Sequence, residues 1–176
     1  MTESTSYEVL ETFDGVEIRR YPTIIMARVS GLSDDMAFRI LFRYITGGNK
    51  VRQDIAMTVP VISTGTTYQR IAMTRPVLSD EESFSFVVPS LYSISTVPQP
   101  LDDRVKLVEI KPRKLAVLRF SGRMHREAVK AKETELLGAV NRRGLKARGE
   151  AFLMRYNGPG TPGFLRRNEV AIEIEG

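Results

Sequence analysis

One seven-residue segment occurs twice in this chain, and this repeat limits the possible folds more than any other feature. Residues 55–61 read IAMTVPV and residues 71–77 read IAMTRPV, so the second copy begins sixteen residues after the first. In each copy the proline disfavours helix at the preceding residue and removes a backbone donor, which predicts an extended strand. Two such strands around a connection that contains Gly65 predict a hairpin.

Length and composition indicate a globular protein. The 176 residues suit a single domain, and 42% of them are hydrophobic. No stretch approaches the roughly 20 apolar residues that cross a bilayer. Residues 1–6 lack the basic and apolar regions of a secretory signal, and the chain has no cysteine. We therefore expect a cytoplasmic protein.

An apolar strand, a glycine and a helix follow one another twice along the chain. The predicted strand–helix pairs are 24–30 with 35–46, and 115–121 with 124–143. A shift of 91 residues superposes RVSG at 28–31 on RFSG at 119–122. The sequence therefore indicates an internal duplication of a strand–helix–strand unit.

The other predicted strands pair antiparallel and place the chain in the α+β class. A hairpin is expected at 7–11 and 16–20 around Asp14-Gly15, with further strands at 83–88, 150–156 and 169–174. The segment 93–103 carries Pro98 and Pro100 and is the expected crossover. Polar alternation at Glu169, Ala171, Glu173 and Glu175 predicts that the last strand is half exposed.

The first predicted helix carries more apolar surface than packing on a sheet requires. When its residues are placed at intervals of about 100°, Phe38 and Phe42 widen the core-facing arc towards Arg39 and Arg43. Two rings beside two guanidinium groups suit a flat apolar ligand that carries carboxylates. The alternatives are that loops cover these rings or that the rings mediate self-association.

Positive charge is concentrated in one block. Residues 111–148 contain twelve Lys or Arg and three Glu, within a chain of net charge +5. This block would suit nucleic acid, an anionic membrane surface or an acidic ligand, but it lacks interleaved aromatic residues and any nucleic-acid motif. A solvated basic face is the preferred interpretation, and nucleic acid ranks last among the possible partners.

Several segments, in the order in which they occur, resemble the SOUL haem-binding protein (HEBP) family. They are YEVL at 7–10, VEIRRYP at 16–22, Gly47-Gly48-Asn49, the two heptads, FSFVVP at 84–89, Phe120-Ser121-Gly122 and RRNEV at 166–170. The resemblance covers almost the whole chain. It implies a single domain of two pseudo-symmetric βαββ halves, about 7–92 and 104–176, that form a twisted, barrel-like antiparallel sheet with two main helices, as in GyrI-like effector-binding domains.

The resemblance also implies a shallow apolar porphyrin site between the first helix and a late loop. In this chain that site falls on Phe38, Arg39, Phe42 and Arg43, with residues 156–167 opposite. Residues 158–165 would form a lid that supplies Phe164 and Leu165, and Arg166 or Arg167 would pair with a propionate. The alternative for residues 166–169 is a local network that anchors the final strand.

No residue stands out as an iron ligand. The sole histidine, His125, begins the second helix, where a surface or capping role is the usual one. Met57, Met73 and Tyr44 have side chains that can ligate haem iron, although their positions favour packing. We expect reversible binding of haem or a related porphyrin with weak or no axial ligation.

The sequence contains no catalytic constellation, because cysteine, a histidine pair, a phosphate loop and a nucleophile elbow are all missing. We therefore expect a soluble tetrapyrrole-binding protein that carries, buffers or delivers porphyrin, and not an enzyme. The alternative is an effector-binding or protein-interaction module that recognises another amphipathic molecule through the same groove.

Overall fold

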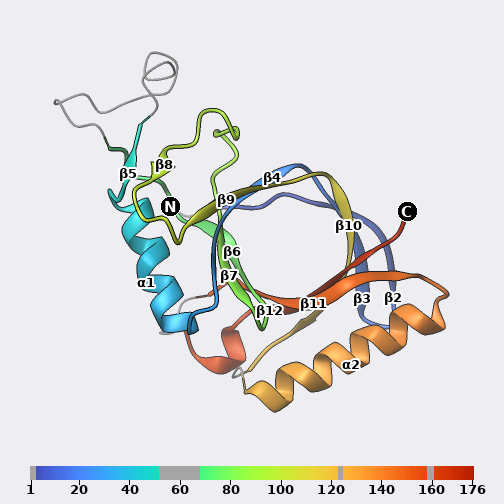
Figure 1. Ribbon diagram of the computed structural model, residues 1–176. Helices are drawn as coiled ribbons and strands as arrows, with labels where there is room; N and C mark the ends of the chain where they lie inside the picture. The colour runs from blue at the N-terminus through green and yellow to red at the C-terminus, as the bar shows by residue number, and fades with distance from the viewer. Residues whose placement is uncertain (1–2, 52–67, 123–124, 158–160) are drawn as a thin grey trace. The chain divides into compact units, whose positions relative to one another are not determined.

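The computed structural model describes residues 3–51, 68–122, 125–157 and 161–176 (Figure 1). Helices α1 and α2 and a set of mainly antiparallel strands confirm the predicted α+β class. The elements in chain order are β1 (Glu3–Ser4), β2 (Glu8–Phe13), β3 (Val16–Tyr21), β4 (Ile24–Ser30), α1 (Asp34–Ile45), β5 (Asn49–Lys50), β6 (Thr74–Ser79), β7 (Ser83–Val87), β8 (Gln99–Pro100), β9 (Lys106–Ile110), β10 (Arg113–Phe120), α2 (Arg126–Arg142), β11 (Ala147–Arg155), the 3-10 turn η1 (Gly163–Leu165) and β12 (Asn168–Ile174).

The chain divides into two compact units. Unit 1 contains Met1–Thr5, Ile24–Arg75 and Glu81–Ile110, and unit 2 contains Ser6–Thr23, Pro76–Asp80 and Lys111–Gly176. The units therefore differ from the consecutive halves expected from the sequence. The reason is that β3, near the N-terminus, pairs with β10 along six residues and so belongs with the C-terminal strands. The duplication and the barrel-like closure stay predictions.

Unit 1 is organised around β4, which pairs antiparallel with β7 on one side and β9 on the other. Helix α1 packs on β4 and β7, and it buries Leu41 and Tyr44 among other residues. The helix begins where the Ser33 hydroxyl accepts a hydrogen bond from the backbone N–H of Met36, which satisfies one of the unpaired donors of the first turn. Asp34 and Asp35 in that turn complement the helix dipole.

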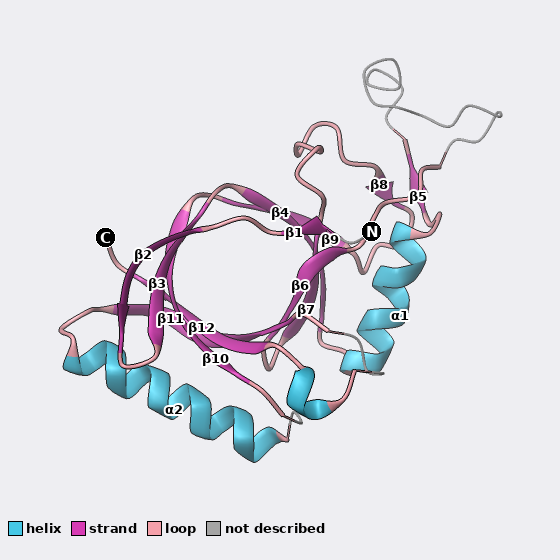
Figure 2. Cartoon of the chain, turned by 180° about the vertical axis from the view of Figure 1, so that it is seen from behind, coloured by secondary structure: helices cyan, strands magenta, loops and turns pink. Residues whose placement is uncertain are grey.

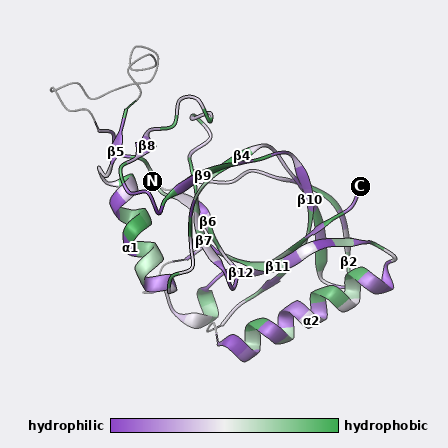
Figure 3. Ribbon diagram, viewed as in Figure 1, coloured by the Kyte–Doolittle hydropathy of each residue, from purple (hydrophilic) through white to green (hydrophobic). Residues whose placement is uncertain are grey.

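Unit 2 is an antiparallel sheet in the order β2-β3-β10-β12-β11-β6. Helix α2 packs on β10, β11 and β12 (Figure 2). The core between helix and sheet is aliphatic and contains Val16, Ile18, Ala116, Leu118, Leu136, Ala139, Val140, Leu153, Val170, Ile172 and Ile174. Both helices carry hydrophobic and hydrophilic residues along their length, as amphipathic helices do (Figure 3).

The hairpin of β2 and β3 has the turn that its sequence predicts. Asp14 and Gly15 both have positive φ, 50° and 77°. These values match the twist of two antiparallel strands joined by a two-residue loop.

The strand predicted at 24–30 is observed as β4, and both predicted helices are observed within two residues of their expected ends. These predictions rest on local interactions. A turn depends on the backbone angles of its own residues, and a helix cap on a hydrogen bond to a residue two or three positions away.

Two other predictions have different outcomes. The second heptad contributes to β6, which begins at Thr74, whereas the first heptad and the connection to Tyr68 lie outside the described residues, so the hairpin between the heptads stays a prediction. The expected half exposure of the last strand is wrong, because six of the seven residues of β12 are buried, including Glu169. The Glu169 carboxylate can be buried because it pairs with the buried guanidinium of Arg19.

Neither helix in the described ranges has the length and apolar character that a membrane-spanning helix requires.

Candidate functional site on helix α1

Two phenylalanine rings lie stacked on the outer surface of α1. Phe38 and Phe42 are four residues apart and therefore one turn apart on the same side of the helix. Their ring centroids are 6.0 Å apart with an interplanar angle of 13°. The two residues keep 40% and 46% of their surface exposed, which is much for residues of this size. Together they present a continuous aromatic surface to solvent.

The stacked pair is held from below by strand β7. Phe38 meets the buried rings of Phe84 and Phe86 edge-on, with centroid distances of 6.5 Å and 5.5 Å. Edge-to-face packing is a favoured aromatic geometry and fixes the orientation of the Phe38 ring. Of these three rings, Phe42 stacks only on Phe38. Phe42 is therefore the outermost residue of the cluster.

Arg39 and Arg43 lie beside the two rings. Both are exposed, and among the residues that the structure describes neither guanidinium takes part in an ion pair. Together with Phe38, Phe42 and Thr46, they line a shallow hollow of about 360 Å³. The structure thus brings together the four α1 residues that the sequence predicted, and it combines an aromatic wall with two positive charges.

A second hollow of about 600 Å³ lies on the other flank of α1. Ile40, Arg43 and Tyr44 line it from the helix, and residues 101–104 line it from the loop before β9. In that loop Arg104 donates to both carboxylate oxygens of Asp102, at 3.0 and 2.7 Å. These hydrogen bonds hold the pKa of Asp102 at about 2. Arg43 lines both hollows. Arg104, the other cation of the second hollow, is paired with Asp102.

The late site residues belong to unit 2. Phe164 and Leu165 are strongly exposed in the short turn η1, and residues 158–160 of the predicted lid lie outside the described part of the chain. The Nε of Arg166 donates to the Thr161 carbonyl at 2.8 Å, which closes the turn on itself. Phe164 and Leu165 stay predictions as ligand contacts.

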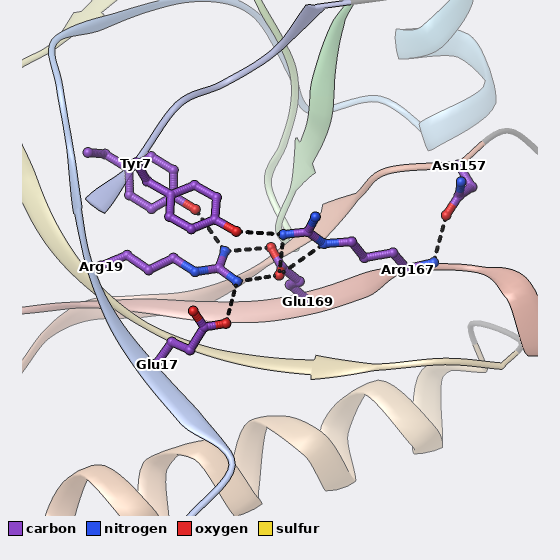
Figure 4. Close-up of polar contacts among 7 residues, drawn as sticks. Tyr7, Glu17, Arg19, Asn157, Arg167 and Glu169 are labelled. Atoms are coloured by element: carbon purple, nitrogen blue, oxygen red, sulfur yellow. Dashed lines mark hydrogen bonds and ion pairs between the residues drawn. The ribbon is translucent and has the colours of Figure 1, made fainter. Parts of the chain in front are cut away.

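Arg167, which the sequence offered as a propionate partner, makes several contacts within unit 2. Its guanidinium donates to Glu169 Oε2 and to the Tyr7 hydroxyl, at 3.1 and 2.9 Å from Nη2 (Figure 4). It also lies over the Tyr156 ring, 4.0 Å from the centroid. Its backbone N–H donates to the Asn157 side chain at 2.6 Å. These contacts tie Arg167 to the final strand, as the alternative interpretation of this segment expects, and Arg167 as a ligand contact stays a prediction.

Sequence reasoning missed the centre of this network. Arg19 on β3 pairs with Glu169 on β12 through two hydrogen bonds of 2.8 and 2.6 Å, and their side chains are 1% and 0% exposed. Glu17 and Tyr21 hydrogen-bond to the same guanidinium from β3. The available signal was the alternation of residues 17, 19 and 21, which places all three on one face of a strand.

Burial and pairing act in opposite directions on these groups. Burial opposes the charge on Glu169, but hydrogen bonds and attraction from Arg19, with attraction from Arg167, hold the pKa of the Glu169 carboxyl below its usual value. Burial likewise opposes the charge on Arg19, yet its pKa is raised because the bonds to Glu169 prevail. Both groups are therefore ionised at neutral pH.

None of the candidate iron ligands that the structure describes is among the residues that line the α1 hollow. Tyr44 is buried and donates its hydroxyl to the Pro98 carbonyl at 2.6 Å, and as an iron ligand it stays a prediction. Met73 is half-buried in unit 1, and His125 is the exposed residue before α2 in unit 2. Met57 lies outside the described residues. Within the described ranges, no three His, Cys, Asp or Glu residues cluster to hold a metal ion.

Comparison with solved structures shows the same fold at low sequence identity. A hydrolase from Listeria innocua has a TM-score of 0.58 and 14% identity, with 91% of each chain covered. An uncharacterized conserved protein from the same organism has a TM-score of 0.56 and 11% identity, covering 90% of this chain and 92% of the other. The EcmrR C-terminal domain has a TM-score of 0.54 and 9% identity, covering 96% and 98%.

No curated protein matches the chain. The SOUL heme-binding protein family, in contrast, matches residues 2–173, which is nearly the full sequence. This match confirms the resemblance that the ordered motifs indicate, and it supports haem binding as the general function. The chain belongs to the SOUL heme-binding protein family.

Proposed function

We propose that this protein binds haem or a related tetrapyrrole reversibly on the outer face of α1, and that it carries, buffers or delivers this ligand. The observation that carries the proposal is the stacked, half-exposed pair Phe38 and Phe42 beside two guanidinium groups without ion pairs among the described residues. The family match supplies the class of ligand.

The aromatic pair suits the face of a porphyrin. A flat apolar ring gains from offset stacking on an aromatic side chain and from removing apolar surface from water. Phe38 is already oriented by Phe84 and Phe86, so its part of the surface is preformed. A preformed surface loses little conformational entropy on binding. Phe42 would make the outer contact with the ring.

The two arginines suit the propionates. A guanidinium binds a carboxylate through two parallel hydrogen bonds, and its charge is retained at any physiological pH. Arg39 and Arg43 are one turn apart, and both line the hollow that the rings occupy. Arg43 also borders the larger hollow and would reach a carboxylate on that side.

The described residues fit the porphyrin ring and its propionates better than they fit the iron. The α1 hollow is lined by Phe, Arg and Thr side chains, and none of these is a usual axial ligand of haem. Bound haem would supply redox and ligand-binding chemistry, while this chain would position and shield the ring. We therefore propose that metal-free porphyrin binds comparably to haem and that the protein acts as a binder and not as an enzyme.

A titration with ferric haem, and in parallel with protoporphyrin IX, tests this proposal through absorbance and tyrosine fluorescence quenching. Saturable one-to-one binding of both ligands with similar affinity is expected. Binding of haem alone with a ligand-shifted Soret band would contradict recognition through ring and propionates. If neither ligand saturates while varied amphipathic dyes bind equally well, the alternative of an effector-binding or protein-interaction module replaces the proposal.

A further inference from the structure

The second hollow beside α1, with a volume of about 600 Å³, lies entirely within unit 1. Of the residues that line it, only Arg43 also lines the hollow of the proposed tetrapyrrole site. Its volume falls within the range of roughly 300–1,000 Å³ that is typical of small-molecule sites. The hollow therefore has room for an organic ligand of its own.

Hydrogen bonds hold the two walls of the second hollow together. The short strands β5 and β8 pair antiparallel near the C-terminal end of α1 (Figure 1). The backbone N–H of Leu101 donates to the Gly48 carbonyl at 3.0 Å, and the Tyr44 hydroxyl donates to the Pro98 carbonyl at 2.6 Å. The loop wall is thus joined to the helix wall before any ligand binds, and a preformed site loses little free energy to ordering.

Four charged side chains line the second hollow, and two of them form a closed pair. Both the guanidinium and the backbone N–H of Arg104 donate to the Asp102 carboxylate. Arg43 on the helix and Asp103 on the loop, in contrast, take part in no ion pair among the residues that the structure describes. Arg43 faces the loop, because its charge adds to the hydrogen bonds from Arg104 that lower the pKa of Asp102. The hollow therefore offers one cation on the helix wall and one anion on the loop wall.

An aliphatic surface adjoins these two charges. Ile40 lines the hollow from the helix, and Leu101 lines it from the loop with 65% of its surface exposed. An aliphatic group that lies against these side chains would remove apolar surface from water, which favours binding. The second hollow thus combines an apolar patch with one accessible charge of each sign.

We propose that the second hollow binds a small zwitterion that carries an aliphatic group, such as a free apolar amino acid. The carboxylate of the ligand accepts hydrogen bonds from the Arg43 guanidinium, and its ammonium group donates to the Asp103 carboxylate. The aliphatic group covers Ile40 and Leu101. This site goes beyond the tetrapyrrole site and does not depend on tetrapyrrole binding.

The charges of the hollow favour a zwitterion over a simple anion or cation. Arg43 and Arg104 balance Asp102 and Asp103, so the lining is neutral as a whole. A ligand with a carboxylate alone would meet repulsion from Asp103, and a ligand with an ammonium group alone would meet repulsion from Arg43. A ligand with both groups pairs with each accessible charge and leaves the site neutral.

A set of three ligands tests the proposal without any variant. The ¹⁵N-labelled protein, free of tetrapyrrole, is titrated with L-leucine, with N-acetyl-L-leucine, which lacks the ammonium group, and with L-leucinamide, which lacks the carboxylate. A mildly acidic pH keeps the amine of leucinamide protonated. L-leucine should give saturable shifts of the Gly48 and Asp103 backbone N–H resonances. Each analogue should bind about fivefold or more weakly, because it loses one charge-assisted contact.

Equal affinity for leucine and either analogue would overturn the proposal, because it would show that one of the two charges is not recognised. No saturable shift with leucine would overturn it as well. Since no tetrapyrrole is present in these titrations, either result leaves the function proposed for the α1 hollow to its own test.

Asp103→Asn and Arg43→Gln assign the two contacts. Each variant should weaken leucine binding about fivefold or more and keep the wild-type thermal midpoint, since both side chains are exposed. Asp103→Asn should also reduce the preference for leucine over N-acetyl-leucine, which a merely structural role would not do. Glu109→Gln and Arg70→Gln, at exposed positions of unit 1 outside the hollow, are the matched controls and should bind leucine as the wild type does. Wild-type affinity in either hollow variant, or an equal loss in the controls, would contradict the assignment.

Discussion

Arg19 and Glu169 are 150 residues apart in sequence, yet the Nη2 atom of Arg19 lies 2.6 Å from Oε2 of Glu169 in the interior of unit 2. Each side chain is buried, and each is the main partner of the other. The pair joins β3 to β12, which are not neighbours in the sheet because β10 lies between them. A contact of this kind ties three strands together through side chains in addition to their backbone hydrogen bonds.

Glu169→Gln should destabilise the protein strongly. The amide leaves the Arg19 charge buried without a counter-charge. Such a change typically lowers the free energy of unfolding by about 3–5 kcal/mol. Urea denaturation followed by circular dichroism measures the effect. Glu173→Gln is the matched control, because it makes the same change at a partly exposed position of the same strand. Substitutions at such positions usually change stability by less than about 0.5 kcal/mol. Similar effects of the two variants would refute a special role for Glu169.

Acid should destabilise the protein in a defined range. The pKa of Glu169 in the folded state lies below its usual value of 4.5, so the folded state binds this proton less readily than the unfolded state does. The free energy of unfolding should therefore be constant from neutral pH to about 5 and then fall as the pH drops below 4.5 towards the lowered pKa. In Glu169→Gln, urea denaturation at several pH values should show a smaller fall. An equal fall in both proteins would assign the acid sensitivity to other carboxylates.

Tyr7→Phe tests the link between the N-terminal segment of unit 2 and Arg167. The variant loses the hydrogen bond from Arg167 Nη2 but keeps the ring over which Arg19 lies at 4.1 Å. Loss of about 1 kcal/mol of stability is expected, below the value for a fully buried charged bond because Tyr7 is only partly buried. Thermal unfolding measures it. An unchanged midpoint would mean that water replaces the hydroxyl without loss.

Phe42→Ala and Phe38→Ala should differ in their effect on folding. Both should weaken protoporphyrin binding, since each removes one ring of the stacked surface. Only Phe38 also packs on Phe84 and Phe86. Phe38→Ala should therefore lower the free energy of unfolding by about 1–3 kcal/mol, and Phe42→Ala by less than about 1 kcal/mol. Leu137→Ala, at a comparably exposed apolar position on α2, is the matched control for binding. Wild-type affinity in Phe42→Ala would exclude ring stacking at this position.

The sequence predicts those parts of the fold in which residues act locally. Asp14-Gly15 specifies a tight turn, Ser33 a helix start and Phe38 with Phe42 an apolar stripe, and the structure contains all three features. The family resemblance, carried by ordered motifs, is confirmed as well. The position of the exposed rings could be predicted because a helix places residues four apart on one side, whatever surrounds it.

The sequence does not predict which charged residues are buried. Glu169 and Glu173 are four residues apart on β12, so the two-residue period of a strand places them on the same face. The period does not say whether that face is exposed to solvent. Burial of Glu169 depends on Arg19, 150 residues away, and on Arg167, whose side chain turns back to it. Only the paired strands bring these three groups together. For the same reason Arg167 was a plausible propionate partner from sequence and is an internal anchor in the structure.

Charge reversal on α1 tests the proposed tetrapyrrole site most directly. The affinity for protoporphyrin IX is measured by fluorescence titration for the wild type, for Arg39→Glu with Arg43→Glu, and for Arg126→Glu with Lys130→Glu, which makes the same change of charge one turn apart on α2. The α1 double variant should bind at least about tenfold more weakly, because two guanidinium–carboxylate contacts are replaced by repulsion, and it should remain folded because both side chains are exposed. The α2 variant should bind as the wild type does. Equal affinity in all three proteins would contradict the placement of the ligand on α1.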